Sequence, residues 1–162
     1  AMRSTIAAPL FDVEFMAAIQ IIVGSVMGTA IEVAQALTHA FTALGHQVWI
    51  NADFQKDHLN NTDEILLVCT SNTGMGDLPM NIVPFYQFLK NDHPNVVGRR
   101  YGVVNLGDSS YPNFAHAGQT LDDALADLGA HRIGEPLVLD AIYVDDHAAE
   151  ARNWAQQWSL LL

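Results

Sequence analysis

The sequence predicts an α/β fold, a three-layer sandwich in which a five-stranded parallel sheet lies between helices. Short apolar runs alternate with helical periodicities along the whole chain, which is the pattern of repeated strand–helix–strand units. No linker, repeat or low-complexity segment divides the 162 residues, and half of them are hydrophobic. This length and composition are sufficient for one domain with its own core.

Five short apolar runs are the expected strands. They are Ala17–Val23, Gln47–Ile50, Ile65–Thr70, Tyr101–Leu106 and Leu137–Leu139. The first run is interrupted only by Gln20, and such nearly continuous apolar character is typical of strands buried on both faces of a parallel sheet. Pro136 lacks a backbone N–H group, so the last strand is expected at an edge of the sheet.

Four helices are expected between and after these strands, each from apolar residues that recur at steps of three and four. Their apolar positions are Ala30, Ala34, Leu37, Phe41 and Leu44; Leu78, Ile82, Phe85 and Leu89; Phe114, Ala117, Leu121, Leu125 and Leu128; and Ala151, Trp154, Trp158 and Leu161. Gly45 and Gly129 should end the first and third helices, and Asp77 should cap the second. Right-handed crossovers then place helices on both faces of the sheet.

Composition narrows the possible partners. The net charge of −11 repels nucleic acid and anionic membranes and favours a basic protein surface, although it equally suits solubility alone. No apolar run approaches the roughly 18 residues that span a bilayer. The single cysteine, Cys69, excludes an intrachain disulfide and suits a reducing, cytoplasmic compartment. We expect it to be a small buried hydrophobe in the third strand.

The first fifteen residues are set apart from the rest. Residues 1–15 precede Met16, which stands directly before the first apolar run. We therefore expect residues 1–15 to be a leader added for expression or a disordered tail, and residues 16–162 to form the domain. The acidic residues Asp12 and Glu14 argue against a signal peptide.

Three loops follow the first, third and fourth strands, and the carboxyl ends of parallel strands are where ligands bind in such sheets. Loop 1, Gly24–Glu32, leads into a helix N-terminus, where free N–H groups favour an anion. It contains no lysine, so a terminal phosphate would be held by neutral donors that include the Ser25 and Thr29 hydroxyl groups. An ordinary tight turn is the alternative for this loop taken alone.

The other two loops add glycines and an aromatic residue. Loop 2, Thr70–Pro79, contains Gly74 and Gly76, which permit close approach of backbone to a ligand. Loop 3, Asn105–Phe114, contains Tyr111 beyond a strand end, a position that favours a stacking surface over a core residue. Each loop alone is a weak indication, but the three together at one sheet edge are far more specific.

These loops resemble those of flavodoxins, especially the short-chain MioC-type proteins and the FMN domains of diflavin reductases. Ser25–Ala30 is similar to the flavodoxin phosphate loop, Thr70–Asp77 to the second flavin loop and Asn105–Phe114 to the third. The resemblance runs from Met16 to the C-terminus and implies a flavodoxin-like sheet of strand order 2-1-3-4-5 that binds FMN non-covalently.

The resemblance also implies which residues surround the cofactor. By position they are Ser25, Val26, Met27, Gly28, Thr29 and Ala30 around the phosphate; Thr70, Ser71, Asn72, Thr73 and Gly74 beside the flavin; and Asn105, Gly107, Tyr111, Asn113 and Phe114 on its other side. Tyr111 is expected to stack on the ring. The chain departs from the family at Met27 and Ala30, which replace common hydroxyl residues, and at Thr73, where many relatives have a second aromatic residue.

The implied function is that of an electron carrier and not of an enzyme. Such a carrier is expected to be a cytoplasmic monomer that shuttles single electrons between a basic NAD(P)H-dependent flavoprotein reductase and an acceptor protein, without nucleic-acid or membrane partners. An FMN-dependent NAD(P)H:quinone-type reductase is the alternative, but no second nucleotide motif is visible. A phosphorylated response regulator is disfavoured because Ser25, Thr70 and Asp140 stand where its acidic and lysine residues would lie.

Two further groups of residues have simpler interpretations. The seven histidines are scattered without metal-ligand spacing, so no metal site is expected. Asp122, Asp123 and Asp127 are read as an acidic helix face, which is solvated or takes part in docking.

Overall fold

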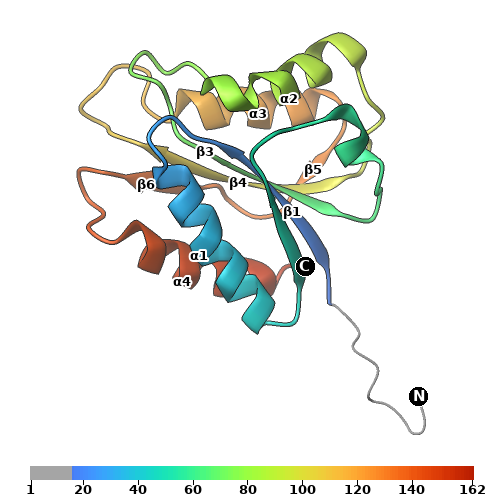
Figure 1. Cartoon of the computed structure of the whole chain (residues 1–162), viewed down its shortest axis with the longest axis horizontal. Coiled ribbons are helices and arrows are strands. Elements are labelled where there is room, and N and C mark those ends of the chain that lie inside the picture. The colour runs from blue at the N-terminus through green and yellow to red at the C-terminus, as the bar shows by residue number, and fades with distance from the viewer. Residues whose placement is uncertain (1–15) are drawn as a thin grey trace, which may run out of the picture.

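The computed structural model describes residues 16–162 as a sandwich of three layers (Figure 1). The sheet contains β1 (Ala18–Gly24), β2 (Gln47–Asn51), β3 (Ile65–Thr70), β4 (Arg100–Gly107), β5 (His131–Arg132) and β6 (Leu137–Asp140). All pairings are parallel, and the order β2-β1-β3-β4-β5 confirms the expected order. The expectation for residues 1–15 lies outside the described residues.

The fifth position of the sheet differs from the expected single strand. Both β5 and β6 pair with β4, with Tyr101 opposite Arg132 and Val104 opposite Leu137. The chain leaves the sheet between them at Gly134, whose φ of +69° belongs to the left-handed region that favours glycine. The expectation of one strand at this edge was therefore incomplete, and its final position holds two short segments.

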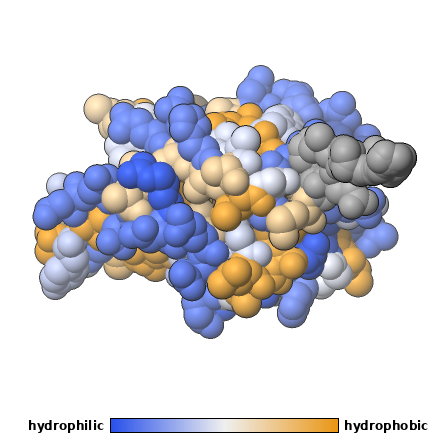
Figure 2. Space-filling model, turned by 90° about the horizontal axis from the view of Figure 1, so that it is seen from below, coloured by the Kyte–Doolittle hydropathy of each residue, from blue (hydrophilic) through white to orange (hydrophobic). Residues whose placement is uncertain are grey.

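Helices cover both faces of the sheet. The helices α1 (Thr29–Ala43) and α4 (His147–Ser159) lie side by side on one face, and α2 (Val83–Gln87) and α3 (His116–Asp127) lie on the other (Figure 1). Side chains alternate between the two layers, so that Ile21 packs in the α1–α4 core and Ile22 in the α2–α3 core. Hydrophilic residues with hydrophobic residues between them form the outer surface on the α1–α4 side (Figure 2).

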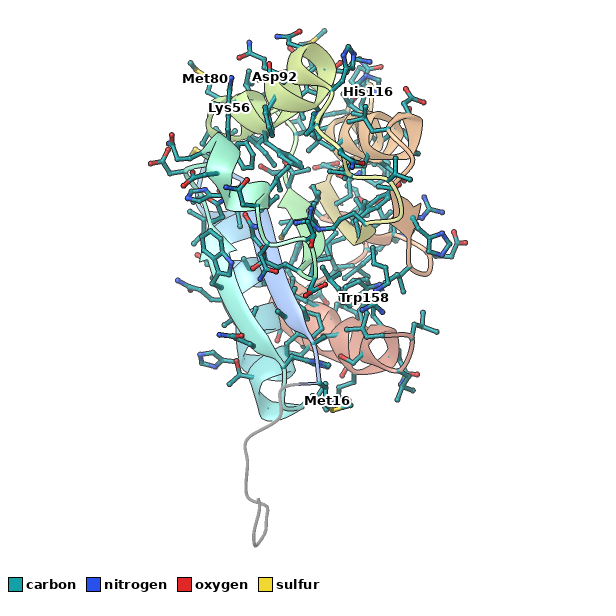
Figure 3. The ribbon with its side chains drawn as sticks, turned by 90° about the vertical axis from the view of Figure 1, so that its right-hand side faces the viewer. Met16, Lys56, Met80, Asp92, His116 and Trp158 are labelled. Carbon is teal, nitrogen blue, oxygen red and sulfur yellow. The ribbon has the colours of Figure 1, made fainter. Side chains whose placement is uncertain are left out.

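Trp158 anchors α4 to the sheet. Its indole points from the helix toward the strands (Figure 3), and its Nε1–H group donates a hydrogen bond of 2.8 Å to the Ile133 carbonyl. The ring fits only because residue 102 is glycine, since a Cβ atom there would lie 2.6 Å from Cζ2 of Trp158. Trp154 is only partly buried, and Leu161 is exposed although the periodicity placed it on the buried face.

The second expected helix begins later than its sequence pattern suggested. Asp77 does not cap it: a 3-10 turn at Met80–Ile82 follows Pro79, and α2 then continues into a π-helical turn at Phe88–Asp92. Proline restricts the residue before it to extended backbone, which delays helix formation until after position 79. Beyond this helix, the Lys56 ammonium and the Asp92 carboxylate lie 2.8 Å apart (Figure 3).

The start of α3 is also displaced, in this case by left-handed backbone. Asn113 and Ala115 have φ of +58° and +61°, so the helix starts at His116 and not at Phe114. Gly45 and Gly129 follow α1 and α3 at φ of +92° and +88°, in agreement with their expected place after the helix ends.

Asp122 does not belong to a solvated acidic face. It is buried, whereas Asp123 and Asp127 are exposed. Its carboxylate accepts a hydrogen bond of 2.5 Å from the Tyr101 hydroxyl group and pairs with the Arg132 guanidinium. The expectation was wrong for this residue because polar partners on the sheet bury it.

Cys69 is fully buried in β3, as expected, and this burial raises the pKa of its thiol to about 12.

None of the helices in residues 16–162 is long and apolar enough to cross a membrane. Within the same residues, no group of three or more histidine, cysteine or acidic side chains is arranged to hold a metal ion.

Candidate functional site

A cavity of about 400 Å³ opens at the carboxyl edge of the sheet, where the three loops meet. The expected residues that line it are Thr29, Ser71, Asn72, Thr73, Gly74, Gly107, Tyr111 and Phe114. Its other lining residues are Leu106, Asp108, Pro112, Ala141 and His147. The cavity therefore brings together one residue of loop 1, four of loop 2 and six of loop 3.

Loop 1 presents backbone donors beside this cavity. Gly28 stands before α1 with φ +92°, and its N–H group donates a hydrogen bond of 2.9 Å to Oγ of Ser25. In the described part of the chain, no side chain caps α1, and the N–H groups of Thr29, Ala30 and Ile31 at its start have no acceptor. Among residues 16–162, the N–H groups of Val26 and Met27 also have no acceptor.

Loop 2 is tied to the neighbouring loops by hydrogen bonds. The Ser71 N–H group donates to the Gly24 carbonyl at 2.9 Å, which joins loop 2 to the end of β1. Oδ1 of Asn72 accepts a bond of 2.8 Å from the Ala117 N–H group in the first turn of α3. Gly74 is exposed, and a Cβ atom there would meet no atom within 4 Å. Its backbone thus faces open space beside the cavity.

Several expected residues hold the loops without lining the cavity. Nδ2 of Asn105 donates to the Ala115 carbonyl at 2.6 Å, and Nδ2 of Asn113 donates to the Met75 carbonyl at 3.0 Å. The Thr70 hydroxyl group donates to the Ser71 carbonyl at 2.9 Å. The remaining expected residues outside the lining are Ser25, Val26, Met27, Gly28 and Ala30.

Loop 3 supplies the aromatic walls. Tyr111 is 61% exposed, so its ring does not belong to the hydrophobic core and is accessible to a ligand. The ring of Phe114 packs against Gly107, where a Cβ atom would lie 2.9 Å from two of its carbon atoms. Glycine at this position is needed for the aromatic ring to form the cavity wall.

The segment after β6 closes the cavity on a side that no motif indicated. The Ala141 N–H group donates to the Gly107 carbonyl at 2.8 Å, and Oδ1 of Asp140 accepts from the N–H groups of Ser109 and Ile142 at 3.1 and 3.0 Å. Desolvation raises the pKa of Asp140, but these bonds to Ser109 and Ile142 outweigh it and leave the pKa below its ordinary value. In the sequence, the acidic residue Asp140 at the end of the last expected strand could have indicated that this segment takes part in the cavity.

The arrangement fits a singly phosphorylated flavin. Free N–H groups at a helix N-terminus bind a phosphate without a nearby cation. Apolar and aromatic walls from Leu106, Tyr111, Pro112 and Phe114, with polar groups from loop 2, suit a planar heteroaromatic ring.

Comparison with known proteins agrees with this geometry. The family model described as Flavodoxin matches residues 21–156. Flavodoxin YqcA of Escherichia coli is 41% identical over 151 residues, which cover 91% of this chain and 99% of that protein. The Protein MioC homolog of Haemophilus influenzae is 34% identical over 136 residues, covering 83% of this chain and 91% of that one.

Two further comparisons extend the similarity. The sulfite reductase [NADPH] flavoprotein alpha-component of Vibrio cholerae is 36% identical over 140 residues, which cover 85% of this chain and 22% of that one. A cysteine-to-alanine mutant of flavodoxin from Pseudomonas aeruginosa superimposes with a TM-score of 0.83 at 34% identity, covering 90% and 98% of the two chains. Flavodoxins are FMN-binding electron carriers and not enzymes. Fold, loops and similarity together show that this chain belongs to the flavodoxin family.

Proposed function

We propose that this chain binds one FMN non-covalently in the carboxyl-edge cavity and shuttles single electrons between a basic NAD(P)H-dependent flavoprotein reductase and an acceptor protein. The observation that carries the proposal is the cavity itself, in which the aromatic walls of loop 3 meet Thr29, the first residue of α1, where loop 1 ends in free N–H groups. The single buried cysteine favours a reducing, cytoplasmic compartment, and we infer a monomeric carrier.

Each loop has a distinct task in this proposal. Ser25–Ala30 would hold the phosphate through backbone N–H groups and the Thr29 hydroxyl group. Ser71–Gly74 would line one side of the flavin, and Tyr111 would offer its ring to the other. Bound FMN supplies the one-electron chemistry, while the protein residues bind it, orient it and limit its exposure to water.

The surface around the cavity suits a basic partner. Exposed apolar side chains stand beside it on loops 1 and 2 and after β6, including Met27 at 89% and Tyr143 at 81% exposure. Asp145 and Asp146, also exposed, follow Tyr143. An acidic chain with an apolar contact area attracts a basic partner over a distance and then buries the apolar atoms. The similarity to an NADPH-named flavoprotein supports a reductase as one partner.

Two measurements test the proposal. Titration with FMN should quench flavin fluorescence at a stoichiometry of one per chain. Anaerobic reduction of the complex should then proceed in two separate one-electron steps, slowly with NADPH alone and rapidly when a basic flavoprotein reductase is added. Because the encounter is electrostatic, the reductase-dependent rate should fall as salt is raised. Unquenched flavin would contradict the proposed cofactor, and rapid direct two-electron reduction by NADPH would contradict the carrier function.

Tyr111→Ala should weaken FMN binding without affecting the fold. Offset stacking of an aromatic ring contributes roughly 0.5–1.5 kcal/mol beyond the buried area, so we expect the dissociation constant for FMN to rise about threefold to tenfold. Fluorescence titration measures this change, and the reduction potentials should shift with it. Tyr143→Ala removes an even more exposed tyrosine ring that does not line the cavity and serves as the control. Equal affinities for the two variants would remove Tyr111 from the site.

A further inference from the structure

We infer that Asn81 is a positioning residue that sets the shape of loop 1 for phosphate and thereby gives the site its preference for FMN over unphosphorylated flavin. The inference rests on the proposed function. Oδ1 of Asn81 accepts a hydrogen bond of 3.0 Å from the Ser25 N–H group. Among residues 16–162, no other side chain outside loop 1 and α1 hydrogen-bonds the segment from Ser25 to Thr29.

The amide of Asn81 is held at both ends. Its Nδ2 group donates to the Val23 carbonyl at 2.8 Å and to the Ala52 carbonyl at 3.2 Å. Val23 and Ser25 lie on either side of Gly24, so one side chain clamps the point where β1 turns into loop 1. Rotating the amide by 180° would face the oxygen toward two carbonyls and the NH₂ group toward an N–H group. All three bonds would be lost, and the orientation is therefore unique.

The position of Asn81 is itself secured by close packing. Asn81 lies in the 3-10 turn Met80–Ile82, and the neighbouring Ile82 is fully buried against the end of β1. A Cβ atom at Gly24 would lie 2.8 Å from Cγ2 of Ile82, so only glycine lets the turn approach this closely. The turn and the beginning of loop 1 thus form one packed unit.

This unit matters for phosphate because loop 1 has no cation. Phosphate binding by loop 1 would therefore depend on the directions of its backbone N–H groups. These include the N–H groups of Val26 and Met27, which have no protein acceptor in residues 16–162. A loop that is already fixed binds more tightly than one that must be ordered on binding. Asn81 does not line the cavity, so its loss should leave the contacts of loops 2 and 3 with the flavin ring intact.

The test compares FMN with riboflavin, which has the same ring and no phosphate. In Asn81→Ala the Ser25 N–H group loses its partner, and we expect FMN affinity to fall about tenfold or more, with riboflavin affinity unchanged. The control is Asn91→Ala, which truncates an exposed asparagine whose side chain makes no hydrogen bond in residues 16–162 and should change neither affinity. If Asn81→Ala does not fold, Asn81→Ser, whose hydroxyl group is too short to reach all three partners, provides the same comparison.

A double-mutant cycle with FMN alone gives a second readout. Ser25→Ala and Asn81→Ala both loosen loop 1, so their combined effect on FMN affinity should be smaller than the product of the single effects. Tyr111→Ala acts on the ring, so its effect should multiply with that of Asn81→Ala. A merely structural role for Asn81 would couple equally, or not at all, to both residues.

The outcomes separate this inference from the proposed function. If the wild-type chain binds FMN and Asn81→Ala keeps the full preference for FMN over riboflavin, the positioning role is wrong while the proposed function stands. A parallel loss of both flavins would also overturn it, because the damage would not be specific to phosphate. A wild-type chain that binds neither flavin would refute the proposed function and this inference with it.

Discussion

Gly28→Val should abolish measurable FMN binding. Gly28 has φ +92°, a left-handed conformation that a β-branched residue avoids. Left-handed strain costs about 1–3 kcal/mol, so loop 1 should rearrange and redirect its N–H groups. This strain and the loss of hydrogen bonds to a charged phosphate act together, so we expect the affinity for FMN to fall roughly a hundredfold or more. Fluorescence titration with FMN measures the change.

The control for Gly28→Val is Gly98→Val. Gly98 has φ +75°, and at both positions a Cβ atom would meet no atom within 4 Å. The two variants therefore carry similar backbone strain and no clash with the protein, but only Gly28 belongs to loop 1. Gly98→Val should lose some stability and keep its FMN affinity. If Gly28→Val binds FMN as tightly as Gly98→Val does, the phosphate lies elsewhere.

Asp122→Ala should produce the largest loss of stability among acidic substitutions in α3. Its carboxylate accepts from the buried Tyr101 hydroxyl group on β4 and pairs with Arg132 on β5. Burial, and then the hydrogen bond to Asp122, raise the pKa of Tyr101, so the phenol stays protonated and needs an acceptor. Removing the carboxylate leaves the hydroxyl group only the Asp122 backbone carbonyl, at 3.2 Å, and leaves Arg132 without this partner. The free energy of unfolding should therefore fall by about 2–4 kcal/mol, measured by urea denaturation.

Asp123→Ala controls for the change in net charge. Asp123 is exposed on the same helix and accepts one hydrogen bond from Gln119, so its removal should change stability by no more than about 0.5 kcal/mol. Asp122→Asn keeps an acceptor for Tyr101 and loses the ion pair, so its stability should lie between the two. Equal unfolding free energies for Asp122→Ala and Asp123→Ala would show that the buried network contributes nothing.

The strands were the most predictable elements. Ile65–Thr70 has the same bounds in sequence and structure, because every residue of this central strand is buried and its apolar run has no competing helical pattern. His131–Arg132 was missed, because two polar residues carry no strand pattern. They join the sheet through pairing with β4, and Asp122 secures Arg132 from α3. Such pairing links residues far apart in the chain.

The loops that line the cavity were located from the sequence, but the part each residue plays in them was not. Strand ends and glycines showed which loops would meet. The conformation of each loop then turned the Asn105 and Asn113 side chains toward backbone carbonyls and left Tyr111 at the cavity. His147 and Asn81 carried no motif, since each reaches loop 1 or the cavity from an element distant in sequence.

The sequence by itself determined the alternation of strands and helices, the acidic charge and the three loops at the carboxyl edge, because these follow from local periodicity, turn residues and composition. The tertiary structure decided which polar side chains are buried and which groups they bind, because both depend on residues that are distant in the sequence. Asp122 is a buried acceptor because Tyr101 and Arg132 meet it, and Asn81 clamps loop 1 because Ile82 packs against Gly24. Burial and hydrogen bonding of a polar side chain depend on partners that its own neighbours in sequence do not specify.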